Sequence, residues 1–555
     1  MPIRYQSALL LIALVQSMTP APADPAAVDL RQRALHNKTA YIPPQCYTKT
    51  RDDDGGVHNP CYVCHTRSRR PNYVNDDDLQ LAYSLPAPAT TNPWTNLFTD
   101  RSAAVAEISD TEIRTYIRQS NYFDAAGRIT PALRLAMPPT GWDFDNDHRW
   151  QGFVPDAQFN FDDDGFDRAT DSEPTGWRAF AYHPFPGTFW PTNGSTGDVL
   201  IRLPEVFRRK PDGRPDLAVY RTNLAIVEAM IREEDVSIPP VDEAAMGSVD
   251  LDKDGRIGTA EVVRYDWAPL EGRRMWYVGE ALQAQRDGKV HLAAGLYPEG
   301  TEFLHTVRYI DTDAAGDNQL AARIKEVRYA RKDRWLNYGR LEAKAAKETR
   351  EKSAFPDRPR FVHGNRETGV SNDLGWTYAG MIEDADGDLR PQSYEELVSC
   401  VGCHGGIGAT TDASFAFPRK IKPGTRHDGW YHWSRHGLRG LPERLRADGE
   451  PEYAYYLSAN GAGDEFRANS EVRGHLFDAQ GALDPTMRDR LQTDVSLLLQ
   501  ASPERAMQLN KAYRVIVREQ RFTAGRDATT MPLQTVYREV DDRDLTGVTA
   551  PLPGR

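Results

Sequence analysis

Apolar residues recur with the period of an amphipathic helix in several parts of the chain. In the segment SDTEIRTYIRQSNYF, Ile113, Tyr116 and Ile117 fall on one helical face, and Ser109 precedes them as a cap. The same period predicts helices in NLAIVEAMIREED, RLEAKAAKETREK and SPERAMQLNKAYRVIVREQ. The segment RLEAKAAKETREK is highly charged, so we expect a helix with a largely solvated surface.

The middle of the chain is broken by proline and glycine, and short apolar runs separate these residues. The runs DVLIRLPEVF and LAVYRTNLAIV are interpreted as strands or mixed elements. No repeat of the solenoid kind is visible in the sequence. The pattern predicts an α+β chain that is mainly helical, with extensive loops and a β-containing middle region.

The first residues have the order of a secretory signal peptide. Arg4 precedes an apolar run from Ala8 to Val15, and the small residues of the segment 21–23 follow it. The run is too short to span a bilayer. We therefore expect a signal peptide over residues 1–23 and a periplasmic or secreted chain, with no membrane span after its removal.

Composition narrows the classes of partner. The formal net charge is −12 and the basic residues are dispersed, which argues against a nucleic-acid partner because such a partner requires a basic stripe. Forty-two glycines and 38 prolines favour a loop-rich architecture, while 11 Trp, 24 Tyr and 19 Phe supply the apolar surface of a folded core.

Four of the five cysteines lie in two copies of the pentapeptide Cys-x-x-Cys-His. On a helix, the two cysteines and the histidine fall at positions i, i+3 and i+4 and share one face. Two thiols can then form thioethers with one haem while the histidine binds its iron, which is the pattern of c-type haem attachment. The residues are Cys61, Cys64 and His65 in the first copy and Cys400, Cys403 and His404 in the second.

Neighbouring residues support helical geometry at both copies. Ser393 and Glu396 form a capping-box pattern before the second copy, and Asn59 and Pro60 fit a helix start at the first. A disulfide, a redox dithiol or a zinc site is the alternative for a Cys-x-x-Cys pair. A zinc site needs both pairs at coordinating spacing, whereas these pairs lie far apart in the sequence. The fifth cysteine, Cys46, is left as a packing residue.

With its signal peptide and two pentapeptides, the chain resembles the bacterial dihaem c-type cytochromes. The resemblance implies cytochrome c-like haem modules and two covalently bound haem c groups. By this resemblance Cys61, Cys64, Cys400 and Cys403 are the thioether residues, and His65 and His404 are the proximal iron ligands. The implied partners are redox proteins or a small-molecule electron donor or acceptor.

The sixth iron ligand decides between a relay and an enzyme, because a haem with two strong protein ligands transfers electrons and an open one binds peroxide or oxygen. In RHDGWYHWSRHGLRG, His432 and His436 are spaced i, i+4 and are the leading candidates at the second haem. Further candidate ligands are His427 and Met381 for the second haem and His183 and His36 for the first. Arg419, Lys420 and Lys422 are candidate partners of the haem propionates.

Three functions remain open at this point. The preferred function is electron transfer by two six-coordinate haems. The alternative is a dihaem enzyme of the peroxidase or oxidase kind with one open-coordinate haem. The third is an interaction protein whose binding surface is held by calcium.

A calcium site is predicted in the segment DLDKDGRIGTAE. Asp250, Asp252 and Asp254 occupy positions 1, 3 and 5 of an EF-hand-like loop, and Gly255 supplies the turn at position 6. The remaining predicted ligands are the carbonyl of Arg256 at position 7 and the carboxylate of Glu261 at position 12, and Ile257 is expected to pack at position 8. Prolines in the preceding VSIPPVDEAAMGSV make the entering helix short or irregular. The clusters DFDNDHRW, FDDDGFD and DADGD are weaker candidates, because none has a glutamate at position 12.

These features divide the chain into six segments. After the signal peptide (1–23) come an N-terminal haem segment (24–100), a mixed region (101–240), the calcium loop (241–270), a connecting region (271–390) and a C-terminal haem region (391–555).

Overall fold

The computed structural model describes residues 35–49, 60–67, 70–72, 77–185, 197, 199–421, 429–460, 470–541 and 543–552. The chain divides into two units, residues 1–36 and 37–555, and the fold below is that of the second unit. The predicted signal peptide lies outside the described residues. Within the described ranges, no helix has both the length and the apolar composition needed to cross a membrane.

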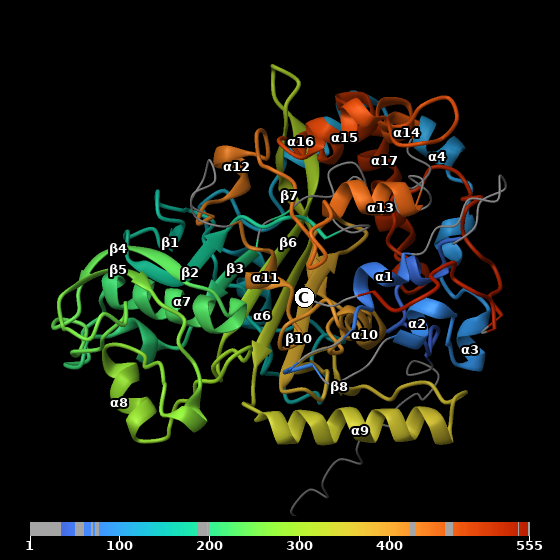
Figure 1. Cartoon of the computed structure of the whole chain (residues 1–555). Coiled ribbons are helices and arrows are strands. Elements are labelled where there is room, and N and C mark those ends of the chain that lie inside the picture. Colours follow the sequence, from blue (N-terminus) through green and yellow to red (C-terminus); the bar gives the residue numbers. More distant parts are fainter. Residues whose placement is uncertain are drawn as a thin grey trace, which may run out of the picture. The chain divides into compact units, whose positions relative to one another are not determined.

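An antiparallel sheet is the main feature of the second unit (Figure 1). In the described part of the chain it has nine strands in the order β1-β2-β3-β6-β7-β10-β9-β8, with β11 paired to β10. The strands are β1 (Phe166–Arg168), β2 (Pro174–Phe180), β3 (Val199–Arg202), β6 (Glu302–Thr312), β7 (Asn318–Lys332), β8 (His363–Asn365), β9 (Gly369–Ser371), β10 (Trp376–Glu383) and β11 (Leu389–Pro391). A separate two-stranded sheet pairs β4 (Val236–Asp242) with β5 (Thr259–Val263).

Both faces of the large sheet are buried. Because side chains alternate along a strand, Leu304 on β6 and Met381 on β10 point to one face, where they pack with Tyr122 and Leu135. Phe303, Trp376 and Tyr378 belong to the main core on the other face, which carries the cavity described below. A sheet covered on both faces is a rigid support for side chains on either side.

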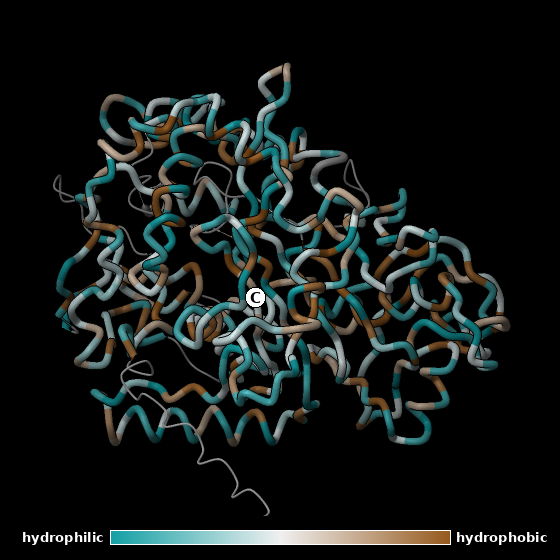
Figure 2. Tube along the Cα trace, turned by 180° about the vertical axis from the view of Figure 1, so that it is seen from behind, coloured by the Kyte–Doolittle hydropathy of each residue, from teal (hydrophilic) through white to brown (hydrophobic). Residues whose placement is uncertain are grey.

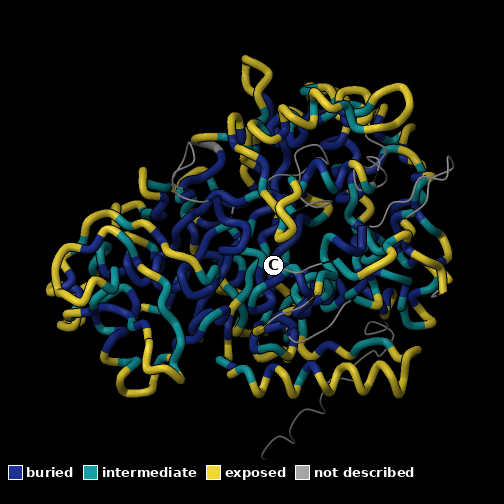
Figure 3. The backbone as a smooth tube through the Cα atoms, in the orientation of Figure 1, coloured by how far each residue is buried: buried dark blue, intermediate teal, exposed yellow. Residues whose placement is uncertain are grey.

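Four helices fulfil predictions made from the hydrophobic period. They are α5 (Asp110–Arg118), α7 (Leu217–Arg232), α9 (Tyr338–Ala354) and α17 (Pro503–Glu519). Ser109 caps α5 as predicted, and its hydroxyl accepts a hydrogen bond from the Glu112 amide at 3.1 Å. Most residues of α9 are exposed and its trace is mainly hydrophilic (Figures 2 and 3), which confirms the prediction of a solvated helix.

The remaining helices are short and lie mostly in the N- and C-terminal parts of the unit. They are η2 (Pro44–Tyr47), α1 (Cys61–Cys64), α2 (Asp77–Leu81), α3 (Ala87–Thr90), η3 (Thr95–Phe98), α4 (Ser102–Ala106), α6 (Thr130–Leu135), η5 (Glu205–Arg208), η6 (Pro269–Glu271), α8 (Glu280–Arg286), α10 (Tyr394–Cys403), α11 (Ala416–Arg419), α12 (Trp433–His436), α13 (Glu452–Asn460), α14 (Ser470–Leu476), α15 (Pro485–Leu491), α16 (Ser496–Leu499) and η8 (Phe522–Ala524).

The structure corrects two expectations about secondary structure. LAVYRTNLAIV is not a strand but the first part of α7, so the helix begins before the segment NLAIVEAMIREED that predicted it. The residues of α7 are buried almost all round, which weakens its amphipathic period. The chain is mixed α+β rather than mainly helical, because the long strands β6, β7 and β10 were not predicted. Residues 37–555 form one unit, so neither pentapeptide sits in a separate helical module.

Candidate functional site

The second pentapeptide lies at the end of α10, which its sequence caps firmly. The Ser393 hydroxyl accepts from the Glu396 amide at 3.3 Å and the Glu396 carboxylate accepts from the Ser393 amide at 2.7 Å, which confirms the predicted capping box. Glu396 also pairs with Arg390 of β11 at 2.9 Å and thereby joins the helix start to the sheet. The helix ends at Cys403, so Cys400 and Cys403 are one turn apart at its end rather than at its start.

His404 follows the helix, and its ring is fixed in one tautomer. Its Nδ1 lies 2.7 Å from the carbonyl oxygen of Ala413. A carbonyl can only accept, so Nδ1 carries the hydrogen and Nε2 keeps a lone pair. Burial lowers the pKa of His404 to about 4, so the ring is neutral at neutral pH. A neutral imidazole whose Nδ1 is bonded to a backbone carbonyl is the state in which histidine binds a metal.

A buried ion pair holds the turn that supplies this carbonyl. Asp412 and Ala413 have φ values of +49° and +58°, in the left-handed region that such residues rarely adopt. The Asp412 carboxylate accepts from the Tyr297 amide at 2.9 Å and from the ammonium of Lys332 on β7. The side chains of Lys332 and Asp412 are 0% and 1% exposed. The sheet therefore positions the carbonyl that orients His404.

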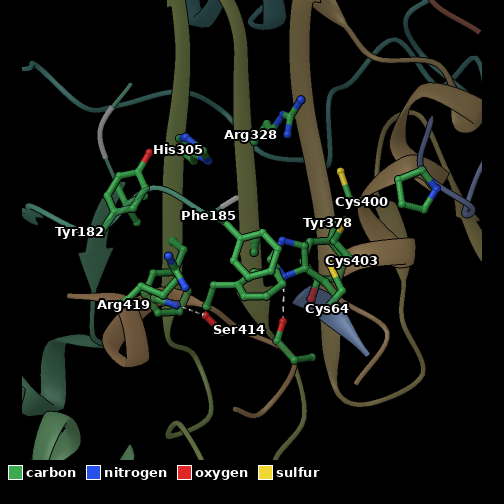
Figure 4. A pocket seen from close by; sticks show the side chains of 18 of the residues that line it. Cys64, Tyr182, Phe185, His305, Arg328, Tyr378, Cys400, Cys403, Ser414 and Arg419 are labelled. Carbon is green, nitrogen blue, oxygen red and sulfur yellow. Dashed lines mark hydrogen bonds between the residues drawn. The ribbon is translucent and has the colours of Figure 1, made fainter. Parts of the chain in front are cut away.

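Cys400, Cys403 and His404 line a cavity of about 220 Å³. The sheet forms one wall of this cavity. Each of three strands contributes two residues at positions i and i+2, which point to the same face of the sheet. These residues are Phe303 and His305 of β6, Arg328 and Ala330 of β7, and Trp376 and Tyr378 of β10. Register supports the grouping, because His305 pairs with Arg328 and both Phe303 and Tyr378 pair with Ala330. In Figure 4, His305 and Arg328 project from neighbouring strands, while Cys400 and Cys403 come from the helical side.

The two pentapeptides, distant in sequence, meet at this cavity. Cys64 of α1 lines it together with Cys400 and Cys403 (Figure 4). The carbonyl of Cys64 accepts a hydrogen bond from the Ala409 amide at 3.0 Å, so the loop after His404 lies directly against the first copy. A Cβ on Gly408 would come within 2.0 Å of the backbone oxygen of Thr66, the residue that follows the first copy, which explains glycine at that position. In Figure 1, α1 accordingly lies beside α10.

The first pentapeptide has the predicted local geometry. Cys61 and Cys64 are the ends of α1, and the His65 amide donates to the Cys61 carbonyl at 2.8 Å. Pro60 is the cap, whereas Asn59, the predicted capping residue, lies outside the described residues. Neither Cys61 nor His65 is among the residues that line the cavity, so Cys64 is where the two copies adjoin.

The surroundings of the cysteines argue against two other uses of a Cys-x-x-Cys pair. In the described ranges, two groups of carboxylates place three ligand atoms close enough for one metal ion, and neither includes a cysteine. A zinc site shared by the pentapeptides therefore has no support. Burial raises the pKa of Cys403 to about 11 and also raises that of Cys400, whereas a redox dithiol needs a lowered thiol pKa.

A family model described as a “-like lipoprotein” matches residues 30–494. The chain belongs to this lipoprotein family. It is also 32% identical to an uncharacterized lipoprotein of Aquifex aeolicus (strain VF5), over 94% of this chain and 92% of the relative. No solved structure matches. The assignment to the dihaem c-type cytochromes was therefore wrong as a family, since two pentapeptides cover only ten residues of the chain. Lipoproteins are exported, which agrees with an extracytoplasmic location.

In this lipoprotein, the predicted distal histidines do not line the cavity. The ring of His432 stacks on Phe161 at 4.8 Å, and His436 is exposed with its ring edge-on to Tyr431 at 4.7 Å. Met381 packs on the opposite face of the sheet, because it is three residues from Tyr378 on the same strand.

The other candidate iron ligands and one candidate propionate partner lie away from the cavity or outside the residues that can be compared with it. His183 does not line the cavity, and burial followed by repulsion from Arg419 lowers its pKa to about 3. His36 belongs to the first unit. His427 and Lys422 lie outside the described residues.

The basic residues expected to meet propionates are paired with carboxylates of the protein instead. Arg419 binds Glu452 at 2.9 Å through two parallel hydrogen bonds, and Lys420 pairs with Glu228 at 3.1 Å with both side chains almost fully buried. Arg419 lines the cavity, but Lys420 does not. Arg328, which the sequence analysis missed, lines the cavity from β7.

The Glu452–Arg419 pair should make stability depend on pH. Burial raises the pKa of Glu452, but attraction to Arg419 outweighs this effect and holds it at about 2, against an ordinary 4.5. A lowered folded-state pKa contributes stability above the unfolded value that is lost as the pH falls toward 2. We expect Glu452→Gln to lower the free energy of unfolding by about 3 kcal/mol at neutral pH. In urea titrations over a pH series, this difference should shrink below about pH 4.5. A difference that stays constant with pH would contradict the assignment.

The predicted calcium loop has strands, not helices, on both sides. Pro239 and Pro240 lie in β4, where the pairing with β5 is interrupted, and proline could not have continued a helix there. Gly255 has the positive φ of +84° expected at the turn, but Ile257 is 48% exposed rather than packed. The EF-hand-like prediction therefore holds for the turn and not for its flanks.

The carboxylates of this loop are arranged differently from the prediction. Ligand atoms of Glu243, Asp250 and Asp252 lie within 4.8 Å of one another, whereas Glu261 is exposed on β5 outside this group. Glu243 is buried and accepts from the amides of Leu251 and Gly258 at 2.6 and 2.8 Å. Asp254 accepts from the Arg256 amide at 2.7 Å. The loop motif in the sequence did not indicate Glu243, because this residue precedes the loop.

The weaker acidic clusters differ from one another. Asp143, Asp145 and Asp147 form the second close group of carboxylates in the described residues. In the other two clusters, Asp162 binds Arg168 and Asp384 accepts backbone amides within the β10–β11 turn. Those carboxylates serve the local turns.

Proposed function

We propose that this lipoprotein carries two covalently bound haem c groups outside the cytoplasm, in the periplasm or after secretion, and transfers electrons between redox partners. The observation that carries the proposal is His404, whose Nε2 keeps a lone pair and which lines an aromatic cavity together with Cys400 and Cys403. These are the donors that covalent haem attachment requires in one place.

In this proposal, Cys400 and Cys403 hold the second haem and His404 binds its iron, while Cys61, Cys64 and His65 do the same for the first. Haem supplies a reversible one-electron couple when bound. The aromatic side chains of the sheet wall keep water away and so set the dielectric around the iron. Cys64 lines the cavity of the second site, so the two groups would be attached to adjoining parts of the chain. That adjacency favours electron exchange between them.

The test is covalent haem content. The full chain is exported from cells with a cytochrome c maturation system, denatured and extracted with acid acetone. We expect the colour to stay with the protein and the mass to exceed that of the polypeptide by two haem groups. Release of the colour into the solvent would refute the proposal.

A haem enzyme of the peroxidase or oxidase kind is the alternative function, and peroxide turnover by the isolated protein would favour it.

We also propose that the loop between β4 and β5 binds structural calcium through Asp250 and Asp252, with Glu243 in place of Glu261. Three carboxylates with close ligand atoms match the oxygen ligands that calcium prefers. Chelation should lower the melting temperature by roughly 2–5 °C, and excess calcium should restore it. The double variant Asp250→Asn/Asp252→Asn serves as the control, since it should melt at the same temperature with and without chelator. An unchanged melting temperature in the parent protein would contradict calcium binding.

A further inference from the structure

We propose that His305 is the second protein ligand of the iron held by His404, an inference that rests on the proposed function. His305 lies on β6 and lines the same cavity as His404, Cys400 and Cys403. His404 directly follows α10 on the helical side. His305, in contrast, projects from the sheet wall (Figure 4). The two imidazoles therefore enter one cavity from different elements, so that both would be available to the same iron if haem were bound there.

Elimination among the cavity residues supports this assignment. Strong second ligands to haem iron are histidine and methionine, with tyrosine or cysteine thiolate in particular enzymes. In the described part of the lining, His305 is the one imidazole besides His404, and no methionine or lysine is present. The cysteines that line the cavity all belong to the two pentapeptides.

Four tyrosines line the described part of the cavity, and three of them have hydroxyls engaged in hydrogen bonds, whereas a tyrosine ligates iron as phenolate. The fourth is Tyr456. The hydroxyl of Tyr378 accepts a hydrogen bond from Asn372 at 3.3 Å. The hydroxyl of Tyr329 donates to Glu302 at 2.5 Å, and burial followed by the charge of Glu302 raises its pKa. The hydroxyl of Tyr182 donates to the Gly197 carbonyl at 3.3 Å.

The surroundings of His305 hold its ring in place. The strand fixes the direction of the side chain, and the ring of Tyr182 packs edge-on against it with centroids 6.1 Å apart. The ring of Trp433 in turn stacks on the ring of Tyr182, with centroids 5.0 Å apart. The aromatic segment that contains His432 thus supports the cavity wall through Trp433. A side chain positioned by a strand and by an edge-on aromatic ring is suited to binding a metal, because little entropy is lost when it binds.

The experiment uses the full exported protein in its haem-loaded form. In His305→Ala, we expect both haems to remain covalently attached by mass, while one of the two low-spin signals in the electron paramagnetic resonance spectrum becomes high-spin. Added imidazole should restore the low-spin signal. The matched controls His432→Ala and His436→Ala should leave both signals unchanged.

A second variant keeps the test informative if His305→Ala fails to fold. His305→Met should stay low-spin and raise the reduction potential of one haem, because a thioether ligand favours the reduced iron. Two unchanged low-spin signals in His305→Ala would overturn the ligand assignment, as would a high-spin second haem in the parent protein. Absence of haem from the parent protein is a different result, since it would refute the proposed function itself.

Discussion

Replacing Cys400 and Cys403 together by alanine will leave the exported protein with one covalently bound haem instead of two. Both sulfurs lie at the cavity beside His404, and without them no covalent bond to the second haem can form. The mass of the denatured protein and its haem absorbance per polypeptide should both show the loss of one group. This is the largest effect expected from any pair of substitutions at the site.

Two further variants sharpen this experiment. Cys61→Ala/Cys64→Ala should also lose one haem, and combining all four substitutions should give a colourless protein. Cys46 is the matched control because it lies in η2, outside both pentapeptides, so Cys46→Ala should keep two haems. A loss of haem in the Cys46 variant, or two haems in either double variant, would contradict the assignment of the thioether residues.

Lys332→Met will lower the free energy of unfolding by about 3–5 kcal/mol, which is the usual cost of breaking a buried ion pair. Both side chains of the Lys332–Asp412 pair are almost fully buried, so the substitution leaves an unpaired carboxylate in the core. The measurement is the urea midpoint and slope of the denaturation curve. Removing both charges in Lys332→Met/Asp412→Leu should recover much of the loss, because no buried charge then remains unpaired.

A surface pair provides the control for this prediction. Lys344 and Asp373 are 3.7 Å apart with side chains 34% and 55% exposed, so Lys344→Met should cost less than about 1 kcal/mol. The buried pair also positions the Ala413 carbonyl, which orients His404. Lys332→Met should therefore also shift the reduction potential of one haem. Equal stability changes in the two lysine variants would refute the structural role given to Lys332.

Local sequence patterns predicted the helices and caps well, because these depend on residues within one or two turns. The capping box at Ser393 and Glu396 and the cap at Ser109 form as expected. Prediction failed at the start of α7, because a helix that is buried almost all round has only a weak amphipathic period. It also missed β6, because both faces of this strand are buried and FLHTVRY does not alternate between apolar and polar residues.

The candidate site shows the same division. Sequence alone indicated Cys400, Cys403 and His404 as a unit, because the donors are close in the chain. It could not indicate His305 or Glu243, since both reach their sites through folding. For the same reason it gave no sign that Cys64 lines the cavity of the second pentapeptide.

By itself, the sequence determined where several helices begin, and it indicated the residues proposed for haem attachment and the turn proposed to hold a cation. These properties depend on spacing along the chain and on local hydrogen bonds. Only the tertiary structure decided that the two pentapeptides adjoin, that Met381 lies on the wrong face of the sheet and that His305 faces the cavity. Those outcomes depend on strand register and on packing between distant segments, which no local pattern encodes.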